Sequence, residues 1–190
     1  MDVKNSLLKD LGLPEDFSTP TLDSMVEGET RYVKDLRMNL SGIGRSKELD
    51  AKEQALLALA IANNNNNKVL EKVYKQKAEE AGATAAEVAE TLACASLLSA
   101  NNVFYRFRHF MGKDTYERMR AGMRMNIMMK PVLGKEFFEL VSLAVSATNG
   151  CEACVQSHEA SLLKLESTEK RIFDAVRLAS VVTSLGKVVY

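Results

Sequence analysis

The chain has 190 residues, of which 46% are hydrophobic and 26% are charged, values typical of one globular domain or of two small repeats that share a core. Its 25 Lys and Arg residues balance 25 Asp and Glu residues, so no overall field draws the protein to nucleic acid or to anionic lipid. Ten Gly and three Pro residues are too few to punctuate a sandwich or barrel of many short strands. The composition therefore predicts an all-α protein.

Three further features of the sequence predict where in the cell the protein is found. The first ten residues lack the basic-then-apolar run of a secretory signal, and the longest apolar stretches fall short of the ~20 residues that span a bilayer. Three cysteines are an odd number and do not form the disulfide framework of a small secreted domain. We therefore expect a soluble cytoplasmic protein in which a close pair of cysteines is catalytic or binds a metal.

Residues 1–28 differ in composition from the rest of the chain and are interpreted as an N-terminal acidic arm. This segment holds two of the three prolines, and its acidic residues outnumber its two lysines, Lys4 and Lys9. From Glu29 onward apolar residues recur at helical spacing, so residues 29–190 are predicted to form one helical domain. The acidic residues of the arm are Asp2, Asp10, Glu15, Asp16, Asp23 and Glu27.

The first half of the domain carries clear start and stop signals for helices. Asp50 and Glu53 form a capping-box pattern before an apolar run, and Thr84 and Glu87 repeat this pattern. Five consecutive asparagines at 63–67 favour a turn over helix or strand. The predicted helices cover residues 29–41, 54–62, 69–82 and 85 to about 100.

The domain is predicted to contain two related helical repeats. Sliding the sequence against itself by 84 positions aligns two separated apolar segments without a gap. A shared offset over two segments indicates duplication, with repeat one at about 50–104 and repeat two at about 134–188. The aligned pairs are Leu56 with Leu140, Leu59 with Leu143, Ala60 with Ala144, Ile61 with Val145, Val88 with Ile172, Ala95 with Ala179, Ser96 with Ser180, Leu97 with Val181 and Leu98 with Val182.

One segment of repeat two, SLAVSATNGCEACVQSHEAS, holds the residues suited to chemistry. Cys151, Cys154 and His158 follow one another at spacings of three and four, which places them on one face of a helix that begins after Asn149–Gly150. Both cysteines fall in the first turn, where free backbone N–H groups and the positive end of the helix dipole favour a thiolate. Two thiols so spaced can also close a disulfide, which predicts redox cycling.

Glu139 is the candidate partner of the histidine. It lies in the otherwise apolar run Phe137–Leu143, and a buried carboxylate needs a polar partner. If the turn at 148–150 folds two helices antiparallel, Glu139 reaches His158 and completes a relay of thiol, imidazole and carboxylate. Repeat one is predicted to be scaffold, because Ala55, Leu70 and Tyr74 stand at the positions of Glu139, Cys154 and His158.

The strings KDLRMNLSGIGRS (34–46), NNVFYRFRHF (101–110), GMRMNI (122–127) and FEL (138–140) followed by AVSATNGCEACVQSHE (144–159) occur in this order. Together they resemble the alkylhydroperoxidase D (AhpD) branch of the carboxymuconolactone decarboxylase family. The resemblance covers roughly residues 29–190 and is more specific than a lone CxxC. It implies an AhpD-like helical fold, a homotrimer, and an antioxidant peroxidase that reduces organic hydroperoxides while cycling between dithiol and disulfide.

The resemblance also implies a role for each site residue. Cys154 would attack the peroxide, Cys151 would be the resolving thiol, and Glu139 with His158 would relay protons. The implied reductant is a dihydrolipoyl group on an acyltransferase partner, with a peroxiredoxin as a downstream client. One departure is Ala153, which stands where some members of the family carry a histidine between the cysteines.

Other functions stay open at this point. A lactone decarboxylase is the alternative enzyme, although decarboxylation has no use for two nearby thiols. The cysteines Cys151 and Cys154 could instead bind zinc together with His158 and Glu139, in a non-enzymatic redox or zinc module. Structural zinc sites, however, more often have a second, separated pair of ligands. A thioredoxin-like enzyme would need a strand before the CxxC. No GxGxxG fingerprint is present, and His109 has no ligand-like neighbour, so no cofactor is predicted.

Three other features are interpreted as structural. Cys94 is predicted to be a small core residue, and the methionines between positions 119 and 129 to form a packed or subunit-facing stripe. Residues 101–130 are locally basic, but the neutral total charge and the lack of a known binding motif favour a solvated or subunit-pairing face over a nucleic-acid site.

Overall fold

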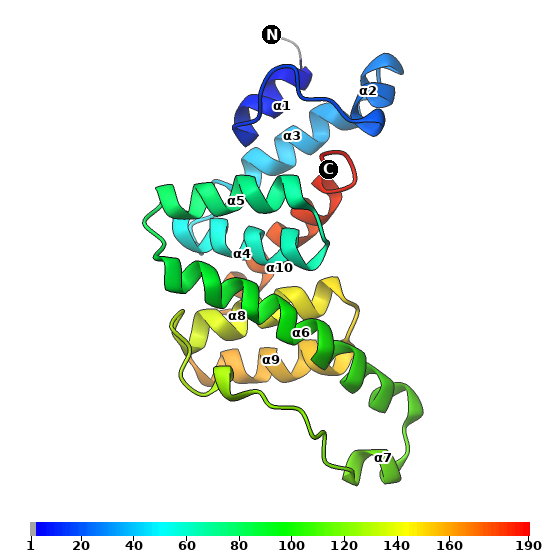
Figure 1. The fold of residues 1–190 in the computed structure, drawn as a ribbon, viewed down its shortest axis with the longest axis vertical. Coiled ribbons are helices and arrows are strands. Elements are labelled where there is room, and N and C mark those ends of the chain that lie inside the picture. Colours follow the sequence, from blue (N-terminus) through cyan, green and yellow to red (C-terminus); the bar gives the residue numbers. More distant parts are fainter. Residues whose placement is uncertain (1–2) are drawn as a thin grey trace.

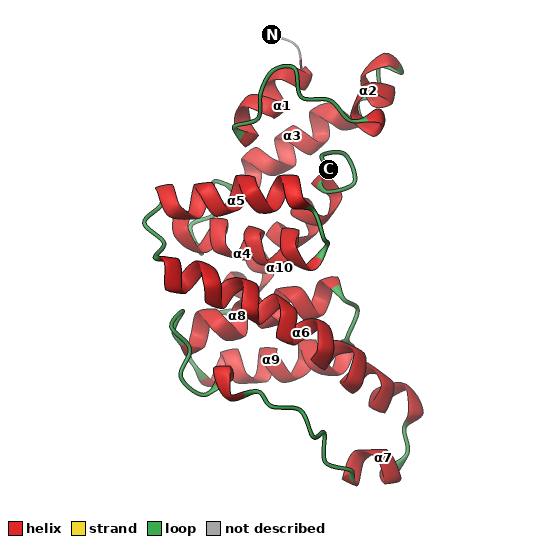
Figure 2. Ribbon diagram, in the orientation of Figure 1, coloured by secondary structure: helices red, strands yellow, loops and turns green. Residues whose placement is uncertain are grey.

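The computed structural model describes residues 3–190, and this part of the chain folds into ten α-helices and one 3₁₀ helix without a strand (Figure 1, Figure 2). The predicted all-α class is confirmed. In the same part of the chain, no helix is both long and apolar enough to cross a membrane. The elements are α1 (Val3–Leu11), α2 (Pro20–Glu27), α3 (Tyr32–Ile43), α4 (Ala51–Asn64), α5 (Lys68–Glu80), α6 (Ala85–Met111), α7 (Asp114–Arg118), η1 (Asn126–Met128), α8 (Lys135–Thr148), α9 (Glu152–Lys164) and α10 (Glu169–Leu185).

Helices α4 and α8 form the centre of the molecule. Every residue of Ala55–Ala62 in α4 and of Phe137–Ser146 in α8 is buried, because these helices are apolar on nearly all sides. Helices α5, α6 and α10 pack on α4, while α9, α6 and α10 pack on α8, and the two central helices also contact each other. The site described below lies on α8 and on α9, which packs against it, so its residues are held by an enclosed element.

The two halves of the domain repeat one structural unit. Helices α4, α5 and α6 start at residues 51, 68 and 85, and α8, α9 and α10 start at 135, 152 and 169, which is 84 residues later in each case. The equivalent turns match too, since Asn66 has a φ of 56° and Gly150 a φ of 67°. The long helices α6 and α10 each pack on both central helices and so join the two repeats. The two-repeat prediction is therefore confirmed.

Local capping signals fix where the helices of repeat one begin. The carboxylate of Asp50 accepts a hydrogen bond from the backbone N–H of Glu53 at 2.9 Å, and the carboxylate of Glu53 accepts one from the N–H of Asp50 at 3.1 Å. Thr84 and Glu87 form the second predicted capping box at the start of α6. The asparagine turn ends in Asn67, whose side chain caps α5 by accepting from the N–H of Leu70 at 2.9 Å.

Helix α6 is longer than the sequence analysis predicts. Its expected end near residue 100 is wrong, because the helix continues to Met111 and ends at Gly112, which adopts a φ of 53°. The second half of α6 extends beyond the body of the protein and leads into α7 (Figure 1). The guanidinium of Arg108 lies 4.6 Å from the ring centre of Phe104, a contact within the helix that stabilises this extension. The side chain of Asn102 donates a hydrogen bond to Ser146 in α8 at 2.9 Å instead of ending the helix.

The N-terminal segment packs against the rest of the protein. Helices α1 and α2 contact α3, at the end of the molecule opposite α7 (Figure 1). Their leucines Leu7, Leu8, Leu11 and Leu22 are buried in the common core, and the Thr19 hydroxyl donates a hydrogen bond to the backbone carbonyl of Val188 at 2.6 Å. The described part of the predicted acidic arm therefore contributes to the hydrophobic core, while residues 1 and 2 lie outside the described residues.

A partly buried ion-pair cluster joins the two repeats. The Arg171 guanidinium in α10 lies 2.6 Å from the Glu53 carboxylate in α4 and 2.9 Å from the Glu136 carboxylate in α8. Burial acts to raise the pKa of Glu136, but the hydrogen bonds from Arg171 and Ser167 outweigh it and leave this pKa below the ordinary 4.5. The cluster therefore stabilises the fold while both carboxyl groups are ionised.

We expect Arg171→Met to lower the free energy of unfolding by about 3 kcal/mol at pH 7, because two partly buried carboxylates lose their cation. Since the folded-state pKa of Glu136 is lowered, its contribution to stability is present above pH 4.5 and disappears as the pH falls through the folded-state value. Urea denaturation should show the difference between wild type and variant shrinking at acid pH. The control Arg118→Met removes an exposed ion pair with Asp114 and should cost at most about 1 kcal/mol. A loss that does not depend on pH would contradict this account.

Candidate active site

The α8–α9 hairpin carries the predicted site residues. Helix α8 ends at Thr148, and Gly150 adopts the positive φ that lets the chain reverse direction. The N–H of Cys151 then donates to the carbonyl of Ser146 at 3.0 Å, which closes the turn. Because α9 begins at Glu152, Cys151 is its N-cap residue and Cys154 lies in its first turn, near the positive end of the helix dipole.

Cys151 and Cys154 are joined by a disulfide bond. The structure therefore holds the oxidised form of the CxxC pair. The two cysteines differ in their surroundings, because Cys151 is 0% exposed whereas Cys154 is 6% exposed and lines a pocket. Of the two sulfur-bearing residues, Cys154 is thus the one that a molecule in the pocket can contact.

Glu139 and His158 meet across the hairpin. A carboxylate oxygen of Glu139 lies 2.7 Å from Nδ1 of His158, and both residues are buried. When the carboxylate accepts the proton of Nδ1, a neutral imidazole has its free electron pair on Nε2. His158 and Cys154 are four residues apart on α9 and line the same pocket. The arrangement orients a base beside the more accessible cysteine.

The pocket beside Cys154 has a volume of 280 Å³ and a mostly apolar wall. Leu98 and Tyr105 of α6 line one part of it, and Met125 and Met128 of the segment before α8 line another. Such a wall suits the organic part of a small substrate, because pockets for small molecules are mainly apolar with a few polar groups.

Asn101 is a polar residue of this pocket that the sequence analysis did not identify as functional. It is 5% exposed, and its side-chain nitrogen donates to the sulfur of Met125 at 3.2 Å. Its side-chain oxygen is buried without a hydrogen-bond partner among the described residues. Buried polar atoms are normally paired, so this oxygen is free to accept a hydrogen bond from a bound molecule.

A network of asparagines holds the turn that precedes Cys151. The side chain of Asn149 donates to Asn102 at 2.8 Å and to Asn64 at 3.1 Å. The guanidinium of Arg106 donates to the backbone carbonyl of Asn149 at 2.6 Å. The turn is thus fixed to α6 and to the end of α4, and this limits the movement of the chain next to the disulfide.

The remaining cysteine and histidine lie outside this arrangement. Cys94 is buried with its sulfur 3.4 Å from the Ser142 hydroxyl, and burial raises its pKa to about 12, so it stays a thiol at neutral pH. His109 is on the exposed part of α6, 3.5 Å from Glu152. Within residues 3–190, no group of three or more His, Cys, Asp and Glu side chains is arranged to hold a metal ion.

Comparison with known proteins agrees with this structure. The family model of the carboxymuconolactone decarboxylase family matches residues 31–109 and again residues 114–189. The chain belongs to the carboxymuconolactone decarboxylase family. The two matches divide the chain between α6 and α7, so each contains one of the repeats.

Three similar proteins share one name, and a solved structure carries another. The alkyl hydroperoxide reductase AhpD of Beijerinckia indica is 39% identical over 164 residues, covering 86% of this chain and 91% of the relative. The proteins of that name from Koribacter versatilis and Corynebacterium kroppenstedtii are each 36% identical, covering 88% of this chain and 86% and 95% of theirs. A solved structure of a gamma-carboxymuconolactone decarboxylase subunit from Burkholderia xenovorans has a TM-score of 0.68 at 17% identity, covering 97% of this chain and 91% of that one. This last likeness shows the fold alone.

Proposed function

We propose that this protein is an alkyl hydroperoxide reductase that protects the cell by reducing organic hydroperoxides through the Cys151–Cys154 pair. The observation that carries the proposal is a CxxC disulfide at the start of a helix, with Cys154 lining an apolar pocket beside an imidazole held by a carboxylate. The name shared by the relatives supports the same activity.

In the first step, His158 takes the proton of the Cys154 thiol, and the Glu139 carboxylate stabilises the resulting imidazolium. The helix dipole also favours the thiolate. The sulfur attacks one oxygen of the hydroperoxide, so an S–O bond forms as the O–O bond breaks. The departing alkoxide takes a proton from His158, or from a water held by Glu139, and leaves as an alcohol. Cys154 is then a sulfenic acid, which is the oxidised product of this step.

In the second step, the Cys151 sulfur attacks the sulfenic sulfur of Cys154, the disulfide forms and water leaves. A second dithiol then reduces the disulfide through a mixed disulfide. We propose a dihydrolipoyl group on a partner protein as this reductant, with a peroxiredoxin as a further client. Because Cys154 lines the pocket and Cys151 is fully buried, the reductant meets the sulfur of Cys154 first.

The substrate is proposed to bind with its organic group against the methionines of the pocket. Its hydroperoxide O–H then donates a hydrogen bond to the unpaired oxygen of Asn101, which lines the same pocket as Cys154. One such bond orients the O–O group without adding charge to the pocket. Hydrogen peroxide has no organic group to place against the apolar wall and is therefore the poorer substrate.

The protein is further proposed to act in the cytoplasm as a homotrimer. Support for association comes from the second half of α6 and the segment between α7 and α8, which expose large apolar side chains. A folded monomer rarely leaves such a patch uncovered. The exposed residues are Val103, Phe107, Phe110, Met119, Met129 and Val132, whose exposed fractions lie between 45% and 74%.

A direct test follows one equivalent of cumene hydroperoxide mixed with the fully reduced protein. We expect the hydroperoxide to disappear as cumyl alcohol forms, and peptide mass analysis to find the new disulfide between Cys151 and Cys154. Added dithiol should then restore the thiols and allow a second equivalent to react. If the reduced protein leaves cumene hydroperoxide unchanged, the proposal is wrong.

A further inference from the structure

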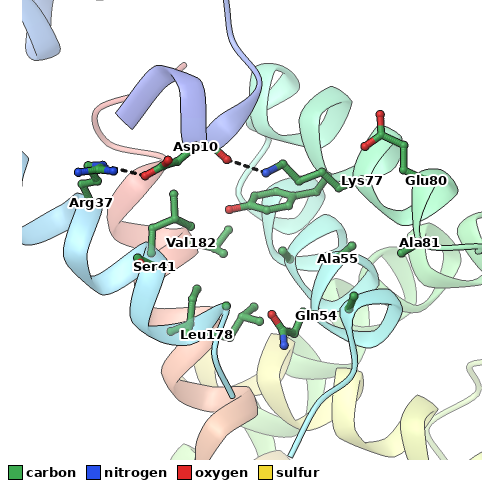
Figure 3. A pocket seen from close by; sticks show the side chains of 16 residues that line it. Asp10, Arg37, Ser41, Gln54, Ala55, Lys77, Glu80, Ala81, Leu178 and Val182 are labelled. Atoms are coloured by element: carbon green, nitrogen blue, oxygen red, sulfur yellow. Dashed lines mark hydrogen bonds and ion pairs between the residues drawn. The ribbon is translucent and has the colours of Figure 1, made fainter. Parts of the chain in front are cut away.

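A second cavity, of 640 Å³, lies on repeat one, between the N-terminal helices and the α4–α5 pair (Figure 3). Helices α1, α3, α4, α5 and α10 all contribute to it. The wall is mainly apolar, and charged side chains gather at one side, where Figure 3 shows Asp10, Arg37 and Lys77. The apolar side chains are Leu40, Ile43, Ala55, Ala58, Leu178 and Val182.

This cavity corresponds to the redox pocket through the internal repeat. Tyr74 and Val182 line it at the positions that His158 and Leu98 hold in the other pocket, 84 residues away in each case. The chain has Leu70 where the second repeat has Cys154. Ala55 replaces Glu139, and its short side chain leaves space next to the tyrosine. Repeat one therefore keeps a pocket at the position equivalent to the redox pocket, but this pocket has no thiols.

The hydroxyl of Tyr74 is the unexplained polar group of this cavity. Tyr74 is 6% exposed, and its hydroxyl has no hydrogen-bond partner among the described residues. Burial raises its pKa, so the group stays protonated at neutral pH and is available as a donor. Leaving a buried hydroxyl unpaired costs stability, and a bound acceptor would remove that cost.

Lys77 adds a positive charge beside this donor. It lies three residues after Tyr74 on α5, which places both on one face of the helix. Its ammonium donates to the backbone carbonyl of Asp10 at 2.8 Å, and no carboxylate of residues 3–190 forms an ion pair with it. Two carboxylates lie near Lys77 without forming an ion pair with it: that of Asp10 is bound by Arg37 at 2.8 Å, and that of Glu80 accepts from Gln76 at 2.8 Å. Burial lowers the pKa of Lys77, while both carboxylates act to raise it.

We propose that this cavity binds a monocarboxylate with an apolar body, such as a fatty acid. The carboxylate would accept hydrogen bonds from the Tyr74 hydroxyl and the Lys77 ammonium, a charge-assisted arrangement. The hydrocarbon chain would lie against the apolar wall formed by α3, α4 and α10. The cavity volume of 640 Å³ is within the range of small-molecule sites. The inference does not depend on the proposed peroxidase activity, because the cavity contains no thiol.

Isothermal titration calorimetry with sodium decanoate tests this inference on the intact protein. We expect one saturable site in wild type and binding at least about tenfold weaker in Tyr74→Phe and in Lys77→Met, since each variant loses one charge-assisted hydrogen bond. Decanol, which has the same chain without the charge, should bind about tenfold weaker than decanoate. Two matched controls should bind decanoate like wild type: Lys75→Met, an exposed lysine on the same helix, and Tyr105→Phe, which removes a hydroxyl from the redox pocket.

A thermal melt separates binding from a structural role of Tyr74. Without ligand, Tyr74→Phe should unfold at a higher temperature than wild type, because a buried unpaired hydroxyl is removed. Decanoate should raise the melting temperature of wild type and leave that of Tyr74→Phe nearly unchanged. The inference is overturned if decanoate gives no binding heat, if decanol binds as tightly as decanoate, or if Tyr74→Phe and Lys77→Met bind decanoate like wild type.

Discussion

We expect Cys154→Ser to lower the rate of hydroperoxide consumption by on the order of a thousandfold or more, because the variant lacks the sulfur that attacks the O–O bond. Serine keeps nearly the same size at a site that is 6% exposed, so the fold should be retained. The measurement is the consumption of cumene hydroperoxide by reduced protein in the presence of excess dithiol. The activity of the matched variant Cys94→Ser should equal that of wild type, because Cys94 is buried beside Ser142 and lies outside the pocket.

Cys151→Ser should also stop turnover, but unlike Cys154→Ser it should accumulate an oxidised intermediate on the protein. Its Cys154 sulfur still attacks one equivalent of hydroperoxide, but no resolving thiol condenses with the sulfenic acid. Dimedone should therefore trap a sulfenic acid on Cys154 of this variant and none on Cys154→Ser. If the dimedone adduct forms instead on Cys151 of Cys154→Ser, the assignment of attacking and resolving thiols is reversed.

Glu139→Gln should slow the reaction of the reduced protein with cumene hydroperoxide about 10²- to 10³-fold, the usual contribution of general acid–base catalysis. Glutamine keeps the shape of the side chain but removes the charge that holds the proton on Nδ1 of His158, 2.7 Å away. His158→Asn, which removes the base itself, should be slowed at least as much. The matched control is Glu90→Gln, because Glu90 is also a buried carboxylate at 8% exposure but accepts its hydrogen bond from the backbone of Leu133.

The alkylation rate of Cys154 distinguishes a proton relay from a merely structural role. In wild type, iodoacetamide should react with Cys154 of the reduced protein near neutral pH, since the thiolate is favoured there. In Glu139→Gln the pH profile of this reaction should move to higher pH, because the imidazolium that stabilises the thiolate is itself less stable. If the profiles of Glu139→Gln and wild type coincide while peroxide turnover falls, Glu139 does not act through the thiolate.

Several features of this protein are determined by local sequence alone. The capping boxes at Asp50 and Thr84 act over four residues and fix two helix starts. The CxxC spacing places two sulfurs within one helical turn, and the disulfide follows from it. These features are predictable because the interactions responsible for them span only a few residues. The roles of Cys151, Cys154, Glu139 and His158 in catalysis, and the boundary at residue 28, stay predictions.

Other features were decided by contacts between distant parts of the chain. The continuation of α6 past residue 100 is held by the hydrogen bond from Asn102 to Ser146 in α8, and the helix ends only at Gly112. The burial of α1 and α2 depends on leucines that meet α3 and the common core, although the segment looks acidic in composition. The contact of Glu139 with His158 requires the reversal at Gly150.

The sequence by itself thus determined the helical class, the duplication and the residue types of the redox segment, since helix signals and thiol chemistry depend on neighbours within one or two turns. Only the tertiary structure decided which polar groups are left without partners. Asn101 and Tyr74 are ordinary residues in the sequence, but the packing of helices far apart along the chain buries the side-chain oxygen of each and gives it no partner. An unpaired buried atom depends on all the surrounding elements at once, and for this reason these two pockets could not be predicted from local patterns.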